Sequence, residues 1–370
     1  MRPGPPLLGN GRTGSSGSYP QPMAATDTLQ AEYDALTKGC GLVDRSERGK
    51  LALTGAGAVE FLNGQVTNEL TDLHPGEGHY AAFLTNKGKM LGDLRILAVG
   101  TGAAEAPTGA AADSADTPTE LLLDTERVAL QALFDMIRRY KIGYDVELHK
   151  RTLESGLLSL IGPEARTCVE RLVGAEKNTF HTEVEHAHTS AQIAETPMRL
   201  IVTAEGIDVL CGASDLETVR SALIDAGATP VGEATGEIVR VERGRPRYGV
   251  DMDESTIPQE AGLNERAVSF TKGCYVGQET VARLYYRGKP NRHLRGLRLS
   301  PRGDATMAIP AAPGDELRLG ERPVGHLSSV VESPRLGTIA LALVRREASP
   351  GDTLAVGEHG ATAELVELPF

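Results

Sequence analysis

The sequence places one thiol, Cys274, in surroundings that could give it a chemical role. Gly273 and Gly277 flank it closely, and glycines let a backbone approach a ligand or adopt positive φ. Lys272 lies two residues before the thiol and could stabilise a thiolate, and Arg283 could add to the positive field. Such a thiol suits a nucleophile, a redox group or a transient metal ligand. The structural alternative is a small buried cysteine in a tight turn.

Two carboxylates stand among apolar residues, where an acid needs hydrogen-bond donors. Asp93 interrupts the start of an apolar strand, and it could accept a hydrogen bond from a ligand N–H or act as a base. Glu242 lies on the apolar side of a helix predicted over 237–243, and the two adjacent N–H groups of a pterin or guanine edge would suit it. The alternatives are a solvated hairpin face for Asp93 and an ion pair with a nearby arginine for Glu242.

The composition limits the classes of protein to which the chain can belong. It has 370 residues, 40% of them hydrophobic, and a formal net charge of −12, which suits two or three globular domains. The acidic balance and the absence of tryptophan argue against a nucleic-acid coat, and no apolar run is long enough for a membrane helix. Four cysteines stand far apart with no C-x-x-C spacing, which disfavours a zinc finger or a self-contained iron–sulfur ligand set. We expect a reducing, cytoplasmic location.

Gly-, Pro- and Ser-rich stretches and turn residues along the chain predict how it divides into domains. Residues 1–27 begin with a run rich in Gly, Pro and Ser and are predicted to be a disordered tail, within which Met23 offers an alternative start. Residues 100–118 are predicted to be a flexible insert between two strands. A strand–turn–helix pattern occurs twice within 28–290 and predicts two related α+β subdomains. Short strands separated by Gly, Pro and Asp turns predict a β-barrel over 291–370.

The string Lys272-Gly-Cys-Tyr-Val-Gly-Gln-Glu279 matches the K-G-C-Y-x-G-Q-E signature of the YgfZ family. Over residues 28–370 the chain resembles that family, which is related to the folate-binding T-protein (aminomethyltransferase) of the glycine cleavage system. Softer matches lie at 48–55, 61–68, 86–89, 243–246 and 323–329. The resemblance implies an α+β fold in which two ferredoxin-like subdomains and a C-terminal β-barrel form a three-part ring around a folate-sized hole.

The resemblance also implies a function, namely a folate-binding factor for the assembly or repair of iron–sulfur clusters in [4Fe–4S] enzymes, including those that modify tRNA. Its cofactor would be tetrahydrofolate or a derivative. That role implies a monomer that makes transient contacts with iron–sulfur assembly proteins and client [4Fe–4S] enzymes. It implies no direct contact with nucleic acid or a membrane and no resident metal. The catalytic residues would be Cys274 and Lys272. The residues expected to bind the folate are Asp93, Glu242, Tyr80, Tyr275, Gly277, Gln278, Glu279 and Arg283.

Two alternatives stay open at this point. Asp93 corresponds to an acid that the T-protein carries on the strand after its glycine-rich turn, and many YgfZ-type proteins lack it. The chain could therefore be a tetrahydrofolate-dependent aminomethyl or methyl transferase, although the T-protein lacks the K-G-C-Y-x-G-Q-E string. The other alternative is a binding module whose pocket has lost its ligand.

Overall fold

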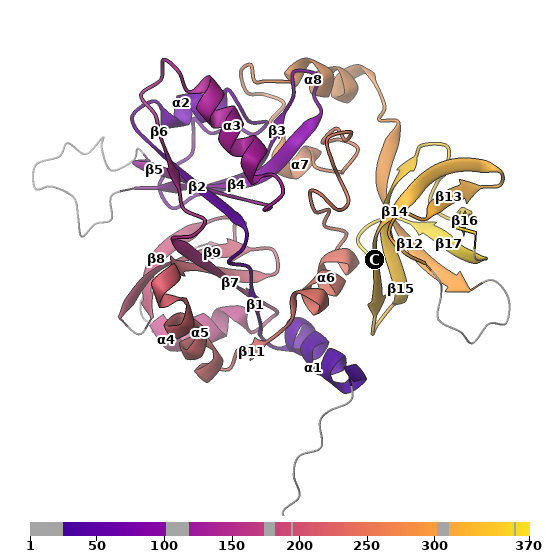
Figure 1. Ribbon diagram of the computed structural model, residues 1–370, viewed down its shortest axis with the longest axis horizontal. Coiled ribbons are helices and arrows are strands. Elements are labelled where there is room, and N and C mark those ends of the chain that lie inside the picture. Colours follow the sequence, from indigo (N-terminus) through magenta and orange to yellow (C-terminus); the bar gives the residue numbers. More distant parts are fainter. Residues whose placement is uncertain (1–24, 101–117, 174–181, 194, 302–310, 359) are drawn as a thin grey trace, which may run out of the picture.

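The chain folds into three lobes, which Figure 1 shows as two mixed α/β subdomains beside a barrel. The computed structural model describes residues 25–100, 118–173, 182–193, 195–301, 311–358 and 360–370. Most of the predicted tail and of the predicted insert falls outside these ranges. The last three residues of the predicted tail, 25–27, instead form the first turn of helix α1 (Ala25–Lys38).

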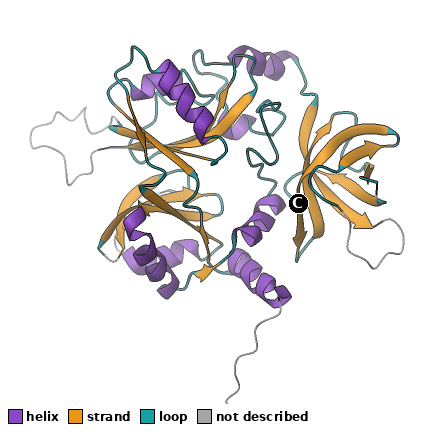
Figure 2. Cartoon of the chain, in the orientation of Figure 1, coloured by secondary structure: helices purple, strands orange, loops and turns teal. Residues whose placement is uncertain are grey.

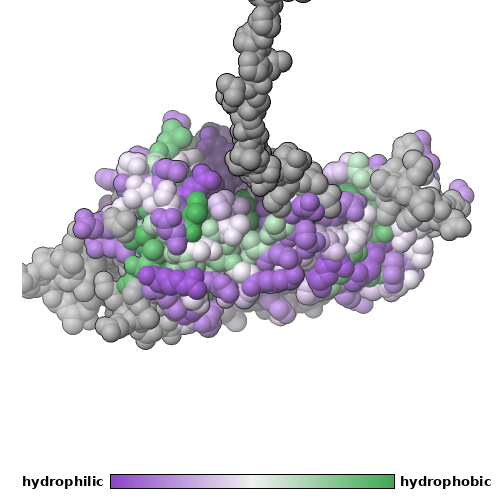
Figure 3. Space-filling view, turned by 90° about the horizontal axis from the view of Figure 1, so that it is seen from below, coloured by the Kyte–Doolittle hydropathy of each residue, from purple (hydrophilic) through white to green (hydrophobic). Residues whose placement is uncertain are grey.

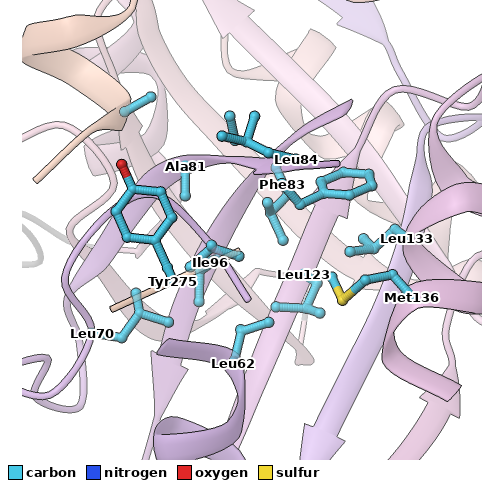
Figure 4. Close-up of a cluster of buried hydrophobic side chains, with 14 of the residues drawn as sticks. Leu62, Leu70, Ala81, Phe83, Leu84, Ile96, Leu123, Leu133, Met136 and Tyr275 are labelled. Atoms are coloured by element: carbon cyan, nitrogen blue, oxygen red, sulfur yellow. The ribbon is translucent and has the colours of Figure 1, made fainter. Parts of the chain in front are cut away.

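The first subdomain is an antiparallel sheet in the order β3-β4-β5-β2-β6. Its central strands are buried along most of their length because helices α2 (Ala58–Asn63) and α3 (Leu130–Tyr140) and the second subdomain pack against them. Figure 4 shows this core, in which Leu133 and Met136 of α3 lie near Phe83 and Leu123 of the sheet. The strands are β2 (Gly49–Thr54), β3 (Gly78–Leu84), β4 (Met90–Val99), β5 (Glu120–Thr125) and β6 (Glu147–Lys150).

The second subdomain repeats the strand–helix arrangement with the strand order β11-β1-β7-β10-β9-β8. Helices α4 (Ala165–Val173) and α5 (Leu216–Asp225) supply apolar side chains to its core, which also holds three buried cysteines, Cys40, Cys168 and Cys211. A short 3-10 turn, η3 (Ala213–Asp215), leads into α5. The strands are β1 (Gly41–Asp44), β7 (Ser155–Ile161), β8 (His188–Ile193), β9 (Thr196–Thr203), β10 (Gly206–Gly212) and β11 (Thr229–Pro230).

Three helices lie along the connection between the subdomains and the barrel. Helix α6 (Glu233–Glu242) packs against α1 on one side and against barrel strand β14 on the other. Helix α7 (Asn264–Ala267) contacts β3, and α8 (Gln278–Arg287) precedes the barrel. In Figure 1, α6 sits among the three lobes, whereas α8 lies at the outer edge of the first subdomain.

The C-terminal lobe is a closed six-stranded barrel, as expected from its turn-punctuated strands. The strand order is β12-β15-β14-β13-β16-β17, and Figure 2 shows the barrel without helices. Closure pairs every edge and buries a core of leucine, valine and alanine. The strands are β12 (Arg292–Pro301), β13 (Glu316–Leu319), β14 (Arg322–Ser333), β15 (Gly337–Arg345), β16 (Thr353–Val356) and β17 (Ala361–Val366).

Figure 3 shows one face of the molecule, on which hydrophilic residues are spread between small apolar patches. Within the described residues, none of the helices combines the length and the apolar character needed to cross a membrane.

Candidate functional site

A cavity of about 210 Å³ opens where the two subdomain sheets and helix α6 meet. This volume is more than ten times the roughly 10–15 Å³ that a single water molecule needs. The wall is rich in charge, with seven arginines and nine acids among its lining residues. The charged lining residues are Arg45, Glu47, Arg48, Asp93, Arg95, Asp124, Glu126, Glu185, Glu205, Asp208, Glu233, Glu237, Arg240, Arg245, Arg247 and Arg266.

Asp93 and Tyr80 form one part of this wall on adjacent strands of the first sheet. Asp93 lies on β4 and is only 6% exposed, so the solvated hairpin position considered above is wrong. The Tyr80 hydroxyl on β3 donates a hydrogen bond to Asp93 Oδ2. Burial raises the pKa of Asp93 to about 6, while the hydrogen bond from Tyr80 opposes that rise. The carboxyl group therefore changes charge close to neutral pH, as a proton-transfer group requires.

The arginines at the base of the cavity are held by fixed acids. Arg95 on β4 reaches across to the second sheet, where its Nη1 lies 2.6 Å from Asp208 Oδ2 on β10, and its Nη2 lies 2.9 Å from Asp124 Oδ2. Arg48 Nε donates to Asp124 Oδ1 at 2.8 Å, and Ser159 Oγ donates to Asp208 Oδ1 at 2.7 Å. This buried network joins the two subdomains and fixes the floor of the cavity.

Glu205 and Arg245, by contrast, are only loosely engaged. Glu205 Oε1 lies 3.5 Å from Arg243 Nη1 and 3.9 Å from Arg245 Nε, both too long for a hydrogen bond. Arg245 Nη1 is buried and has no hydrogen-bond partner among the described residues, with Glu185 Oε1 at 3.8 Å. A buried polar atom without a partner is costly, so this pair has donor and acceptor capacity left for a ligand.

His186 is a third group that sequence reasoning missed. Its imidazole lines the cavity near Tyr80, with ring centroids 6.3 Å apart, and burial lowers its pKa to about 4. Its backbone has a φ of +74°, in the left-handed region that residues other than glycine seldom adopt. The bond from His186 N to Val202 O at 2.8 Å holds this geometry. Glu205 and His186 lie in turns of the second subdomain and Arg245 lies just after α6; site residues concentrate in such segments, and that position was the available signal.

Glu242 does not line the cavity, which corrects its assignment to the ligand site. Tyr33 of α1 donates to both of its carboxylate oxygens at 2.9 and 3.0 Å. Ser333 of β14 donates to Oε1, and Arg335 Nη2 lies 3.3 Å from Oε2. The cavity face of α6 carries Arg240, and two residues at about 100° each turn Glu242 away from that face. The arginine-paired structural alternative for Glu242 is thus the arrangement that the structure contains.

The lysine of the K-G-C-Y-V-G-Q-E motif is a structural group. Lys272 Nζ donates to Asn63 O at 2.7 Å, Asn63 Oδ1 at 2.8 Å, Val66 O at 3.0 Å and Asn68 O at 2.6 Å. These oxygens lie at and just after the C-terminal end of helix α2, so the ammonium group ties the motif to the first subdomain. Burial lowers the pKa of Lys272 to about 8. With every N–H donating to protein oxygens, Lys272 has no free donor for the Cys274 thiol, contrary to its predicted role.

Two further motif residues are also structural. Tyr275 is 8% exposed and packs in the core of the first subdomain, near Leu70 and Ala81 in Figure 4. Gly277 adopts a φ of +85° immediately before α8, and a Cβ at this position would lie 2.5 Å from Thr85 O. Only glycine fits there without strain.

The remaining motif positions face outward. Cys274 is the one exposed thiol of the four cysteines. Gln278 Nε2 donates to Gly273 O at 3.2 Å, and Glu279 and Arg283 are exposed on α8. Of the predicted site residues, Tyr80 and Asp93 line the cavity, whereas Glu242, Lys272, Cys274, Tyr275, Gly277, Gln278, Glu279 and Arg283 do not.

Comparison with known proteins gives a consistent assignment. Residues 13–272 match the model of the GCVT N-terminal domain, and residues 292–370 match that of the glycine cleavage T-protein C-terminal barrel domain. An aminomethyltransferase of Rubrobacter xylanophilus is 28% identical over 344 residues, which cover 92% of this chain and 86% of the relative. An aminomethyltransferase of a Synechococcus species is 30% identical over 355 residues, covering 92% and 90% of the two chains.

A solved structure has the same fold. The glycine cleavage system aminomethyltransferase T from Bartonella henselae aligns with a TM-score of 0.75 and 21% sequence identity. The alignment covers 92% of this chain and 89% of that one, so it includes both subdomains and the barrel.

Proposed function

Because the chain belongs to the glycine cleavage T-protein family in both its N-terminal domain and its barrel, we propose that it is a tetrahydrofolate-dependent transferase of an aminomethyl or methyl group. The observation that carries the proposal is the buried Asp93–Tyr80 pair in the wall of a charged cavity. It favours a transferase over an iron–sulfur factor as the primary function. The reason is that the cavity is lined by Asp93, the acid expected of a transferase, and not by Cys274, the thiol of the motif.

The side chains of Glu205 and Arg245, which have unused hydrogen-bonding capacity, fit the polar edge of a pterin ring. That edge presents two adjacent N–H donors beside a carbonyl oxygen. The Glu205 carboxylate can accept from the N–H groups, and the unpartnered Arg245 Nη1 can donate to the oxygen. Glu205 would thus take the role that sequence reasoning gave to Glu242. Arg95 and Arg266 also have a buried Nε without a hydrogen-bond partner among the described residues, but their guanidinium groups lie 2.6 and 3.0 Å from acids, whereas no acid lies within 3.5 Å of Arg245 in the ion pairs of the described residues.

Asp93 would accept and release the proton of the reacting amine. Tetrahydrofolate, when bound, supplies the nitrogen atoms that accept the one-carbon group. An ionised Asp93 accepts a hydrogen bond from an amine N–H and can take up its proton, while Tyr80 fixes the orientation of the carboxylate. The nearby Arg48 guanidinium opposes the pKa rise caused by burial, so the ionised form is populated at neutral pH.

A transfer assay tests this proposal. Purified protein would be given tetrahydrofolate and an aminomethyl or methyl amine donor, and the one-carbon folate product would be followed. We expect turnover that falls by about 10²–10⁴-fold in Asp93→Asn, the usual contribution of a general acid–base group. The structural variant Glu242→Gln serves as the control and should retain turnover. A wild type without turnover on secondary or tertiary amine donors, or an Asp93→Asn protein as active as wild type, contradicts the proposal.

A specific observation supports a second candidate function, the maintenance of iron–sulfur clusters. The K-G-C-Y-V-G-Q-E string of the YgfZ branch is intact, and the structure exposes its thiol outside the cavity. One thiol cannot provide the four ligands of a [4Fe–4S] cluster, so Cys274 would act through transient contact with cytoplasmic assembly proteins or client enzymes. A Cys274→Ser chain that sustains full [4Fe–4S] enzyme activity in cells lacking the wild type would eliminate this candidate.

A further inference from the structure

One exposed surface of the molecule has no role in the cavity. It consists of Phe270, two residues before the K-G-C-Y-V-G-Q-E motif, and five residues in or just after α8. We call it the α8 surface, and its members are Phe270, Arg283, Tyr285, Tyr286, Arg287 and Lys289. Figure 1 shows α8 at the outer edge of the first subdomain, apart from α6 and the cavity wall that it carries.

The aromatic part of the α8 surface is an ordered cluster. The rings of Phe270 and Tyr285 stack with centroids 3.7 Å apart and an interplanar angle of 15°. Tyr286 meets Tyr285 edge-on at 5.0 Å, and its hydroxyl donates to Phe270 O at 3.3 Å. Tyr285 nevertheless remains 51% exposed and Tyr286 64% exposed. Preformed and exposed aromatic groups of this kind are typical of the centres of protein interfaces.

The charged part is positive in a chain whose net charge is −12. Arg283, Arg287 and Lys289 are exposed, and none of them forms an ion pair with any residue that the structure describes. Glu279 is the one acid between residues 278 and 290. Most arginines of the cavity, by comparison, are paired with acids. These three cations are therefore available to a partner.

Folding of the chain does not account for this surface. Val281 is the buried residue of α8, and Gln259 Nε2 anchors the helix by donating to Val281 O at 2.9 Å. Tyr286 and the three cations are exposed. An aromatic cluster left in water with unpaired cations around it is a feature of a binding surface rather than of a core.

We propose that the α8 surface is a docking site for another protein that presents an acidic segment with apolar side chains. The carboxylates would pair with the cations, and the apolar groups would cover the tyrosine rings. A nucleic acid is the less favoured occupant, because three cations on a strongly acidic chain offer little phosphate neutralisation. The proposal is independent of the transferase activity, since no residue of the α8 surface lines the cavity.

The test uses the full chain and a fluorescein-labelled peptide of alternating Glu and Leu as the probe, with anisotropy at low salt as the readout. We expect saturable binding that weakens about tenfold or more in Arg283→Glu/Arg287→Glu and in Tyr286→Ser. The matched control is Arg138→Glu/Arg139→Glu, which reverses two exposed arginines beside the exposed Tyr140 of α3 and should leave binding unchanged. Unfolding curves that coincide with wild type establish that each variant is folded.

Three results overturn the proposal. They are absence of peptide binding to the wild type, an equal loss in the α3 control, and tighter binding of a single-stranded oligouridylate than of the peptide. The last result would identify the surface as a nucleic-acid site.

Discussion

Asp93 and Glu242 are both buried carboxylates, yet their surroundings give them different roles. Glu242 receives hydrogen bonds from Tyr33 and Ser333 and lies beside Arg335, so its oxygens are satisfied within the protein. Asp93 is held by Tyr80 and faces a cavity. Burial among apolar residues is thus a poor guide to function at the residue scale. Unused hydrogen-bonding capacity beside an open space is the better one.

The raised pKa of Asp93 predicts how activity depends on pH. Its carboxyl group is protonated below a pKa of about 6 and ionised above it. If the ionised form accepts the proton, the transfer rate should rise with pH through about 6 and level off near neutral pH. Asp93→Glu should retain a rise with a shifted midpoint, whereas any residual activity of Asp93→Asn should be flat there. The rate measured from pH 5 to 8 checks this, and a wild-type profile without an inflection near 6 speaks against the assignment.

The four oxygen partners of Lys272 predict a structural effect at the same scale. In Lys272→Met, the buried oxygens at and just after the end of α2 would lose their donor, and the free energy of unfolding should fall by about 1–3 kcal/mol, the usual cost of buried polar groups left unsatisfied. Lys289→Met is the control, because an exposed lysine without an ion pair should change stability by less than about 0.5 kcal/mol. Urea unfolding measures both. Equal stabilities of the two variants would return Lys272 to a role at the thiol.

At the scale of elements, the placement of the K-G-C-Y-V-G-Q-E motif and of α8 depends on the backbone conformation of one residue, Gly277. Gly277 and Gly337 both have positive φ, but a Cβ at 277 would meet Thr85 O at 2.5 Å, whereas nothing lies within 4 Å of one at 337. The alanine variants therefore separate conformational strain from steric conflict. Left-handed strain alone amounts to about 1–2 kcal/mol.

We expect Gly337→Ala to lower the free energy of unfolding by about that amount and Gly277→Ala to lower it further, since strand β3 would have to move. Thermal and urea unfolding of the two variants provide the measurement. A smaller effect at 277 than at 337 would show that α8 does not depend on its close contact with the end of β3.

The elements also explain what could be predicted from the sequence. The strand–helix repeat and the barrel follow from local hydrophobic periodicity and turn residues, and both are confirmed. Asp93 was found because an acid in an apolar strand is conspicuous. The partners of Lys272 lie about two hundred residues away in the chain, as does Tyr33 from Glu242. No local pattern reports such pairings, so two structural residues were assigned to a site.

At the scale of the whole molecule, the cavity belongs to no single lobe. Arg95 links the first sheet to the second, and α6 closes the third side. The barrel reaches the wall through α6, where Ser329 Oγ lies 2.7 Å from Arg240 Nη2. Glu205, Arg245 and His186 were missed because they join Tyr80 and Asp93 in one cavity wall only when the subdomains pack together.

This architecture predicts that a substitution of Glu242 lowers the stability of the protein without weakening ligand binding. Glu242→Ala leaves the hydroxyl of Tyr33 without its acceptor and weakens the contact of α6 with the barrel. The free energy of unfolding should fall by about 1–3 kcal/mol, while the affinity for tetrahydrofolate changes little. Urea unfolding and calorimetry on the same protein decide the point. Loss of affinity without loss of stability would place Glu242 back in the ligand site.

The most direct measurement is a calorimetric titration of the wild-type chain with tetrahydrofolate beside Glu205→Gln. Both proteins should unfold at the same denaturant concentration, because the Glu205 side chain makes only long ion-pair contacts with the residues that the structure describes. We predict saturable binding to the wild type and an affinity at least about tenfold lower in the variant, since hydrogen bonds to a charged group contribute about 1.5–3 kcal/mol. Absence of binding to the wild type, or equal affinities, would contradict it.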